Sequence, residues 1–290
     1  MIIHANVIVN NIGLLLLPSF FCGYHEAAEV RATCYPNEMS LYNISSDDGR
    51  NFRVSADAVK HSESFMECIS VNKIAANSRA VSEHSVSGAI LDRIIPWCEH
   101  HKYGNVPNKV TEWDRTHLTS KNRKDRMNLV LAASLLKMKD LKRMSIQLFC
   151  EQETSQDTGF IHLQSKDGRA FQMSLNAAKQ SLLLAQILEN LSGKSPVFPI
   201  TVDSTSAQLD ILVKWCEYHK GEPIPVMDPR QNPFDATVPQ FDKDLLRFGN
   251  QKMMEIIGAG AALEINGFVK NATKTWIGKE LSVERLSAMF

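Results

Sequence analysis

The sequence predicts an α+β protein built from two tandem copies of one unit. Three observations lead to this fold class. The segment WCEHHK at 97–102 returns as WCEYHK at 215–220. An Asp-Gly pair stands upstream of each copy, between short runs of alternating polarity, which indicates a β-hairpin. Helical patterns follow each hairpin and close each copy, so each unit combines a small sheet with a helical cluster.

The repeat extends well beyond the two Trp-Cys segments. Residues 45–64 match 164–183, and residues 129–149 match 256–276. A period of this length indicates a duplicated structural unit. The sequence therefore predicts an N-terminal extension (1–39), a first repeat (40–155), a second repeat (156–275) and a short tail (276–290).

Each unit is expected to present its elements in one order. The hairpin comes first and is followed by a single helix, over 56–70 in the first unit and 176–192 in the second. A short strand, the Trp-Cys helix and two more helices complete the unit. Pro96 falls inside the first Trp-Cys helix, where a proline removes a hydrogen bond. That helix is expected to be kinked there or to begin later.

Composition excludes several classes of function. Lys and Arg total 32, as do Asp and Glu, so the net charge of zero gives no reason to expect a nucleic acid partner. The six cysteines are scattered, which favours reduced thiols in an intracellular protein. The apolar N-terminus is short, interrupted by Asn10, Asn11 and Pro18, and has no basic residue before Leu14. The sequence therefore disfavours a membrane span and a secretion signal.

The Trp-Cys segments invite a metal-site interpretation, in which Glu99, His100 and His101 join Cys98 as ligands. Neighbouring residues on a helix point about 100° apart, however, and the second unit has Tyr218 in place of His100. A buried structural stripe is therefore the favoured interpretation. LSGKSP at 191–196 and GAG at 258–260 lack the glycines of nucleotide-binding motifs. The sequence predicts no catalytic residue, cofactor or metal.

Together these motifs resemble a known family. The order DG-x-x-F, AK-x-S, W-C-x-x-H-K, W-D and L-A-A-x-x-L-x-M-K-x-L resembles the S-phase-kinase-associated adaptors, over about 250 residues. The resemblance implies a BTB/POZ fold and a non-enzymatic adaptor that links F-box proteins to a cullin in SCF ubiquitin ligases, in cytoplasm or nucleus. The alternative is a BTB-type scaffold or decoy that binds F-box or BTB partners without a cullin.

The resemblance also suggests residues for each partner. Apolar positions near the C-terminus correspond to an F-box groove, although these residues could instead close the core of the second unit. The F-box-binding candidates are Ile265, Phe268, Trp276, Leu286 and Phe290. In the family an Asn-Tyr pair faces the cullin, and here smaller or different residues replace it, which predicts weak cullin binding. The cullin-binding candidates are Ser134, Leu135, Ala261 and Ala262.

Two further expectations follow from the family pattern and the duplication. The acidic loop typical of the family is neutral or slightly basic here, at residues 71–85 and 190–198. Recognition that depends on that loop is not expected. Two linked BTB units can also pair with each other at high effective concentration, so the chain is a candidate for an internal pseudo-dimer.

Overall fold

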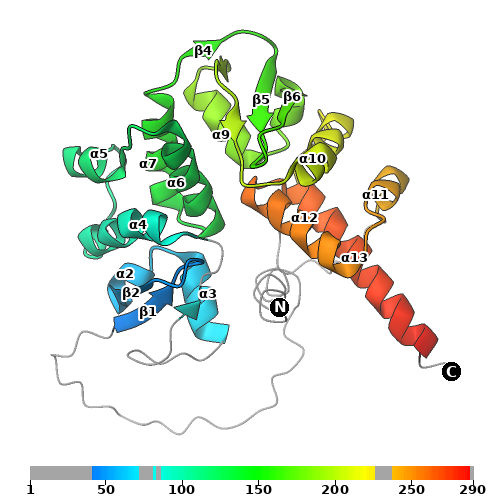
Figure 1. Cartoon of the computed structure of the whole chain (residues 1–290), viewed down its shortest axis with the longest axis horizontal. Coiled ribbons are helices and arrows are strands. Elements are labelled where there is room, and N and C mark those ends of the chain that lie inside the picture. The colour runs from blue at the N-terminus through cyan, green and yellow to red at the C-terminus, as the bar shows by residue number, and fades with distance from the viewer. Residues whose placement is uncertain (1–40, 72–80, 83–85, 226–236, 288–290) are drawn as a thin grey trace, which may run out of the picture.

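The computed structural model describes residues 41–71, 81–82, 86–225 and 237–287 (Figure 1). The N-terminal extension and Phe290 lie outside the described residues. We call residues 41–150 unit one and residues 155–287 unit two. Each unit has a three-stranded sheet and a helical cluster, which confirms the predicted α+β class.

Unit one begins with the predicted hairpin. Its strands pair in antiparallel register from Leu41 opposite Ser55 to Ser45 opposite Asn51, and Gly49 turns the chain with a φ of 78° that favours glycine. A short third strand pairs in parallel with the first, giving the order β2-β1-β3. The elements of unit one are β1 (Leu41–Ser45), β2 (Asn51–Ser55), α2 (Ala56–Val59), α3 (Glu63–Val71), β3 (Val81–Ser82), α4 (Gly88–His101), α5 (Glu112–Leu118), α6 (Arg123–Leu135) and α7 (Lys139–Cys150).

Unit two repeats this plan. Its sheet has the order β6-β5-β8, with Gly168 at the hairpin turn, and a separate two-stranded ladder joins β4 to β7. The elements of unit two are β4 (Ser155–Gln156), β5 (Phe160–Gln164), β6 (Ala170–Ser174), α8 (Leu175–Ala178), α9 (Leu182–Asn190), β7 (Ser195–Pro196), β8 (Ile200–Thr201), α10 (Ser206–Tyr218), α11 (Gln240–Leu245), α12 (Asn250–Ala262) and α13 (Asn266–Ser287).

The single helix predicted after each hairpin is wrong, because two helices stand there in each unit. Ser62 and Ser181 separate them. Each hydroxyl accepts a hydrogen bond from the backbone three residues on and donates to a distant carbonyl, that of Leu136 or Leu263. A serine that caps a new helix and is tied to another element ends the preceding one.

The Trp-Cys helix of unit one does not start late. Helix α4 runs from Gly88 to His101 with Pro96 inside it. Pro96 and Asp92 both lie on the exposed side of α4, where water can reach the backbone at the hydrogen bond that the proline removes. The expectation of two closing helices per unit is also wrong. A short helix, α5 or α11, precedes the two long ones.

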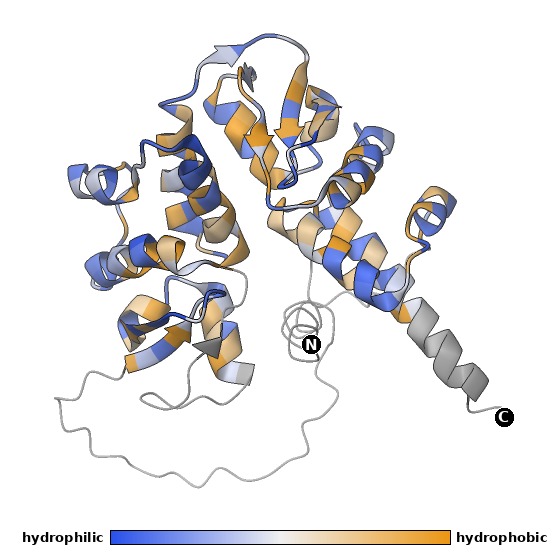
Figure 2. Ribbon diagram, in the orientation of Figure 1, coloured by the Kyte–Doolittle hydropathy of each residue, from blue (hydrophilic) through white to orange (hydrophobic). Residues whose placement is uncertain are grey.

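Two hydrophobic cores organise the molecule, and one of them draws on both units. The first core lies entirely within unit one and includes Trp97, Leu129 and Leu141. The second contains the strands and helices of unit two together with side chains from the opposite faces of α6 and α7. Figure 2 shows that β5 and α9 of unit two are coloured largely hydrophobic. The α6–α7 pair therefore lies between the two cores and packs on both.

Candidate functional site

The repeated Trp-Cys-Glu-x-His-Lys segment builds a buried histidine–aspartate contact in each unit, but only the tryptophan of unit one donates a hydrogen bond to the aspartate. In unit one, His101 Nε2 lies 2.8 Å from Asp114 Oδ1, and the Trp97 indole N–H donates to the same oxygen over 3.1 Å. The Asp114 side chain is fully buried and His101 nearly so. We call Trp97, His101 and Asp114 the unit-one lock, because it fixes α4 against α5.

Unit two carries a matching lock. His219 Nε2 lies 2.8 Å from Asp242 Oδ1, and its Nδ1 lies 2.7 Å from Glu222 Oε2. The ring of Trp215 stacks on His219 with centroids 4.2 Å apart. We call Trp215, His219 and Asp242 the unit-two lock. The histidine and the aspartate recur in both units because they contact each other in each unit.

The exchange of His100 for Tyr218 is explained by a stacking partner. His100 stacks on Trp113 with centroids 3.7 Å apart, and Tyr218 stacks on Phe241 at the same distance. Both ring pairs lie close to parallel, with an interplanar angle of 5°. Histidine and tyrosine are both accepted at this position because each presents a flat ring that stacks on the aromatic residue before the buried aspartate.

The glutamate and lysine of the repeated segment hold the hairpin. Glu99 accepts hydrogen bonds from the Ser55 backbone N–H at 2.7 Å and the Ser55 hydroxyl at 3.0 Å. Glu217 makes the same two contacts with Ser174, at 2.6 and 3.1 Å. Burial raises the pKa of each carboxyl, but the hydrogen bonds from serine and from Lys102 or Lys220 outweigh it and hold the pKa below its usual range.

The cysteine is a core residue in both units. Cys98 and Cys216 are both buried, and burial raises the pKa of the Cys216 thiol to about 12 and that of Cys98 higher still. Thiols so hard to deprotonate are poor metal ligands and poor nucleophiles. Within the described residues no three His, Cys, Asp or Glu side chains are grouped to hold a metal ion.

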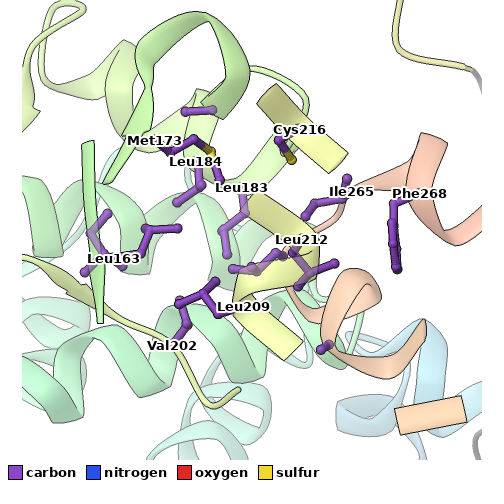
Figure 3. Packing of buried hydrophobic residues seen from close by; sticks show 14 of the residues in the cluster. Leu163, Met173, Leu183, Leu184, Val202, Leu209, Leu212, Cys216, Ile265 and Phe268 are labelled. Atoms are coloured by element: carbon purple, nitrogen blue, oxygen red, sulfur yellow. The ribbon is translucent and has the colours of Figure 1, made fainter. Parts of the chain in front are cut away.

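The F-box-binding candidates divide into buried and partly exposed positions. Ile265 and Phe268 are fully buried in the second core, where they pack near Leu212 and Cys216 (Figure 3). Both residues help to close the core of unit two, which was the alternative to an F-box groove in the sequence analysis. Trp276 is only partly buried. Leu286 lies in α13, but its side chain is outside the described part of the structure. Phe290 lies outside it altogether.

The cullin-binding candidates also occupy unequal positions. Ser134 is 7% exposed, and its hydroxyl donates to Glu264 of unit two. Leu135 packs partly buried against the unit-one core. Ala261 and Ala262 are partly exposed on unit two. Ser134 is thus taken up by the contact between the units, whereas Leu135, Ala261 and Ala262 remain partly exposed.

Sequence reasoning missed the residues that join the two units. Lys142 Nζ lies 2.8 Å from Glu264 Oε1, and the Arg123 guanidinium donates to the carbonyls of Pro199 and Phe198 over 2.6 and 3.0 Å. One signal was available. Residues 129–136 are apolar on all sides except Ser134, which indicates a helix buried on two faces.

The contact between units does not have the symmetry expected of a pseudo-dimer. Helix α7 packs on α9, and α6 packs on α12 and β8. In unit one, α3 is equivalent to α9, and in unit two, α13 is equivalent to α7. A two-fold pair would therefore repeat the α7–α9 contact between α13 and α3. No such contact stands among the main contacts of the described elements. The association is internal but joins different faces of the two units.

The fold and the locks define a class of protein before any comparison. Two small α+β units carry corresponding histidine–aspartate locks. No helix in the described part of the chain has the length and apolar character needed to span a membrane. The chain is thus a tandem of two α+β units, each with the small sheet and helical cluster expected of a BTB/POZ fold.

Comparison with known proteins identifies the units. The profile of the Skp1 family tetramerisation domain matches twice, at residues 41–103 and 159–221. A protein of Arthroderma benhamiae named E3 ubiquitin ligase complex SCF subunit sconC is 29% identical over 122 residues, which cover 41% of this chain and 73% of the relative. The protein of the same name from Aspergillus terreus is 28% identical over 112 residues, covering 38% and 69%.

The two matched segments occupy corresponding parts of the two units, so the profile of the Skp1 family tetramerisation domain occurs twice in tandem in this chain.

Proposed function

We propose that the chain is a non-enzymatic SCF-type adaptor that binds F-box proteins through the second repeat (156–275) and the tail that follows it (276–290). The observation that carries this proposal is the length of α13. It spans 22 residues, whereas its unit-one counterpart α7 spans 12. Figure 1 shows α13 running out beyond the rest of unit two. A helix that continues past its own core has a surface to offer a partner.

The contact partner on this surface is an apolar helical segment. Trp276 lies on α13 with its side chain partly exposed, although its indole nitrogen is itself buried. A large, partly exposed aromatic side chain is typical of an interface anchor. Ile265 and Phe268, buried beneath, support α13 rather than touch the partner.

Cullin engagement is the second part of the proposal, and each unit keeps candidate residues partly exposed for it, Leu135 in unit one and Ala261 and Ala262 in unit two. In unit one, Ser134 is bonded to Glu264 and is therefore covered. In unit two, Ala261 and Ala262 offer little side chain, so cullin binding through them is expected to be weak. This observation also favours a second candidate function, a scaffold or decoy that binds F-box proteins without a cullin.

The two candidates are separated by one experiment. The purified full chain is incubated with an F-box domain and, separately, with the N-terminal domain of a cullin. Binding of both supports a working ligase adaptor, whereas binding of the F-box domain alone supports the decoy. If the F-box domain is not bound, the proposed function is wrong. The Trp276→Ala variant is the matched test of the surface, with Trp113→Ala on unit one as its control.

A further inference from the structure

The outer face of α6–α7 in unit one is fully covered by unit two. Phe149 is 0% exposed and Ile146 1% exposed, and both belong to the core of unit two rather than to that of unit one. The Cys150 thiol lies 3.8 Å from the Ile187 carbonyl of α9. The covered residues of this face are Met127, Val130, Leu131, Ile146, Phe149 and Cys150.

The equivalent face of unit two is not covered in the same way. The repeat aligns Phe149 with Trp276 and Cys150 with Ile277, and both of these unit-two residues are partly exposed. Among the described elements the main contacts of α13 are with α12 and α11, both from unit two. The same helical face is thus buried in one unit and partly open in the other.

Polar contacts anchor the covered face. Glu264 stands at the turn between α12 and α13 and accepts from both Lys142 and Ser134. At the other end of the face, Arg123 donates to the carbonyls of Phe198 and Pro199 and pairs with Glu153, whose side chain is 2% exposed. Two charged anchors at opposite ends fix the register of an otherwise apolar contact.

The charged anchor residues of this contact have no counterparts at the equivalent positions of the other unit. The same contact can therefore form only once within a chain. The repeat aligns Arg123 with Asn250 and Lys142 with Val269, neither of which carries a charge. The position of Glu264 is taken in unit one by Lys137, which already pairs with Glu67 at 2.8 Å. A second chain could therefore not add its α12–α13 face to unit one with the same polar contacts, and growth of a filament is disfavoured.

We infer that unit two acts in cis as the partner of the α6–α7 face of unit one, so that a chain with two adaptor units offers one partner face. This inference rests on the proposed function only for the identity of the external partner. The linker between α7 and β4 is four residues long, which keeps the two faces at high effective concentration.

Cys150 reports on this contact without any partner protein. Burial, followed by the charges of Glu153 and Glu151, raises the pKa of its thiol to about 12. Cys98 lies in the unit-one core, and Cys216 lies on α10 in the unit-two part of the second core; both serve as internal controls. Cys68 is partly exposed and serves as the accessible reference. The experiment alkylates the full chain at pH 8 and follows each cysteine by peptide mass.

In the wild-type chain Cys150 is expected to react at least tenfold more slowly than Cys68. The double variant Arg123→Glu/Glu264→Lys removes both anchors and is expected to speed Cys150 alkylation at least tenfold, with Cys98 and Cys216 unchanged. The charge swap Lys142→Glu/Glu264→Lys restores the pair and is the matched control, with a rate near wild type. Wild-type Cys150 reacting as fast as Cys68, or a rate unchanged in the double variant, would overturn the inference.

The number of partner faces is measured by calorimetric titration with an F-box domain. One site is expected on the wild-type chain and two on Arg123→Glu/Glu264→Lys. Two sites on the wild type, or one on the opened variant, would contradict the single-face inference. No binding to any variant would instead overturn the proposed function, while the Cys150 result would still decide whether the faces are paired.

Discussion

The two locks use the same histidine–aspartate contact but secure the second carboxylate oxygen differently. In unit one, Asp114 Oδ2 accepts from the backbone N–H and hydroxyl of Thr111, at 2.9 and 2.6 Å, in a capping box at the start of α5. In unit two, Pro239 stands at that position and has no N–H to donate. There the Asn271 amide of α13 donates to Asp242 Oδ2 instead.

This difference shows how duplicated units can divide their roles. The unit-one lock is closed within its own segment, because Thr111 lies three residues from Asp114. The unit-two lock reaches α13, the helix proposed to bind the partner. Substitution of Asp114 should therefore affect only its own segment of unit one. Substitution of the equivalent Asp242 should also destabilise α13, the helix proposed to bind the partner.

The largest expected effect comes from removing either aspartate. Asp114→Ala removes the buried acceptor shared by His101 and Trp97, and Asp242→Ala leaves His219 with Glu222 alone. Removing one partner of such a buried pair typically costs about 3–5 kcal/mol of unfolding free energy. Only Asp242→Ala also releases Asn271, so it alone is expected to speed hydrogen exchange in α13. Urea unfolding and hydrogen–deuterium exchange measure the two effects. Equal exchange in α13 for both variants would mean that the locks do not differ in this way.

The next comparison sets Phe149 against its counterpart Trp276. Phe149→Ala opens a cavity in a fully buried site and should lower the unfolding free energy by about 3–5 kcal/mol. Trp276→Ala should cost less than half of that, because the ring is partly exposed. Affinity for an F-box domain should respond in the reverse order, with a loss of about 2 kcal/mol for Trp276→Ala and little change for Phe149→Ala. A loss of affinity confined to Phe149→Ala would reverse the assignment of roles.

Smaller effects separate the two ways of holding the second oxygen. Thr111→Ala removes the cap of α5 and should cost about 1 kcal/mol, with exchange rising in α5. Asn271→Ala removes one hydrogen bond to a charged group and should cost about 1.5–3 kcal/mol, with exchange rising in α13. Thr111→Ser retains the cap and is the control for the first. The prediction fails if Asn271→Ala raises exchange in α5 or α11 but leaves α13 unchanged.

The smallest effect concerns acid stability, where the two units should behave alike. Glu99 and Glu217 each have a pKa held below the ordinary 4.5, so their contribution is complete above pH 4.5 and is lost as the pH falls through the lowered folded value. Glu99→Gln and Glu217→Gln should therefore flatten the fall in stability below pH 4.5, each by a similar amount. Unfolding midpoints measured between pH 3 and pH 7 test this, and an unchanged acid limb in both variants would contradict it.

The regular parts of the fold could be predicted from the sequence because their signals are local. Asp-Gly between alternating runs predicted both hairpins, and Gly49 and Gly168 adopt the positive φ that the turns require. The repeat itself predicted two units of one fold. The helix breaks at Ser62 and Ser181 were missed because each serine is held by a carbonyl more than seventy residues away.

The functional site was less accessible to sequence reasoning because apolar residues serve cores and interfaces alike. Phe268 and Trp276 look equivalent as F-box candidates in the sequence, yet Phe268 is fully buried and Trp276 is not. The anchoring pair of Lys142 and Glu264 joins residues 122 positions apart, and no local pattern connects them. Only the packing of α6–α7 between two cores identifies that face as an interface.

The most direct test of the division between the units is hydrogen–deuterium exchange of the full chain with and without a saturating F-box domain. Slower exchange confined to α12 and α13 is predicted, with α3, α6 and α7 of unit one unchanged. Protection of α6 and α7 on addition of the F-box domain would show that unit one also receives the partner, which would contradict the account.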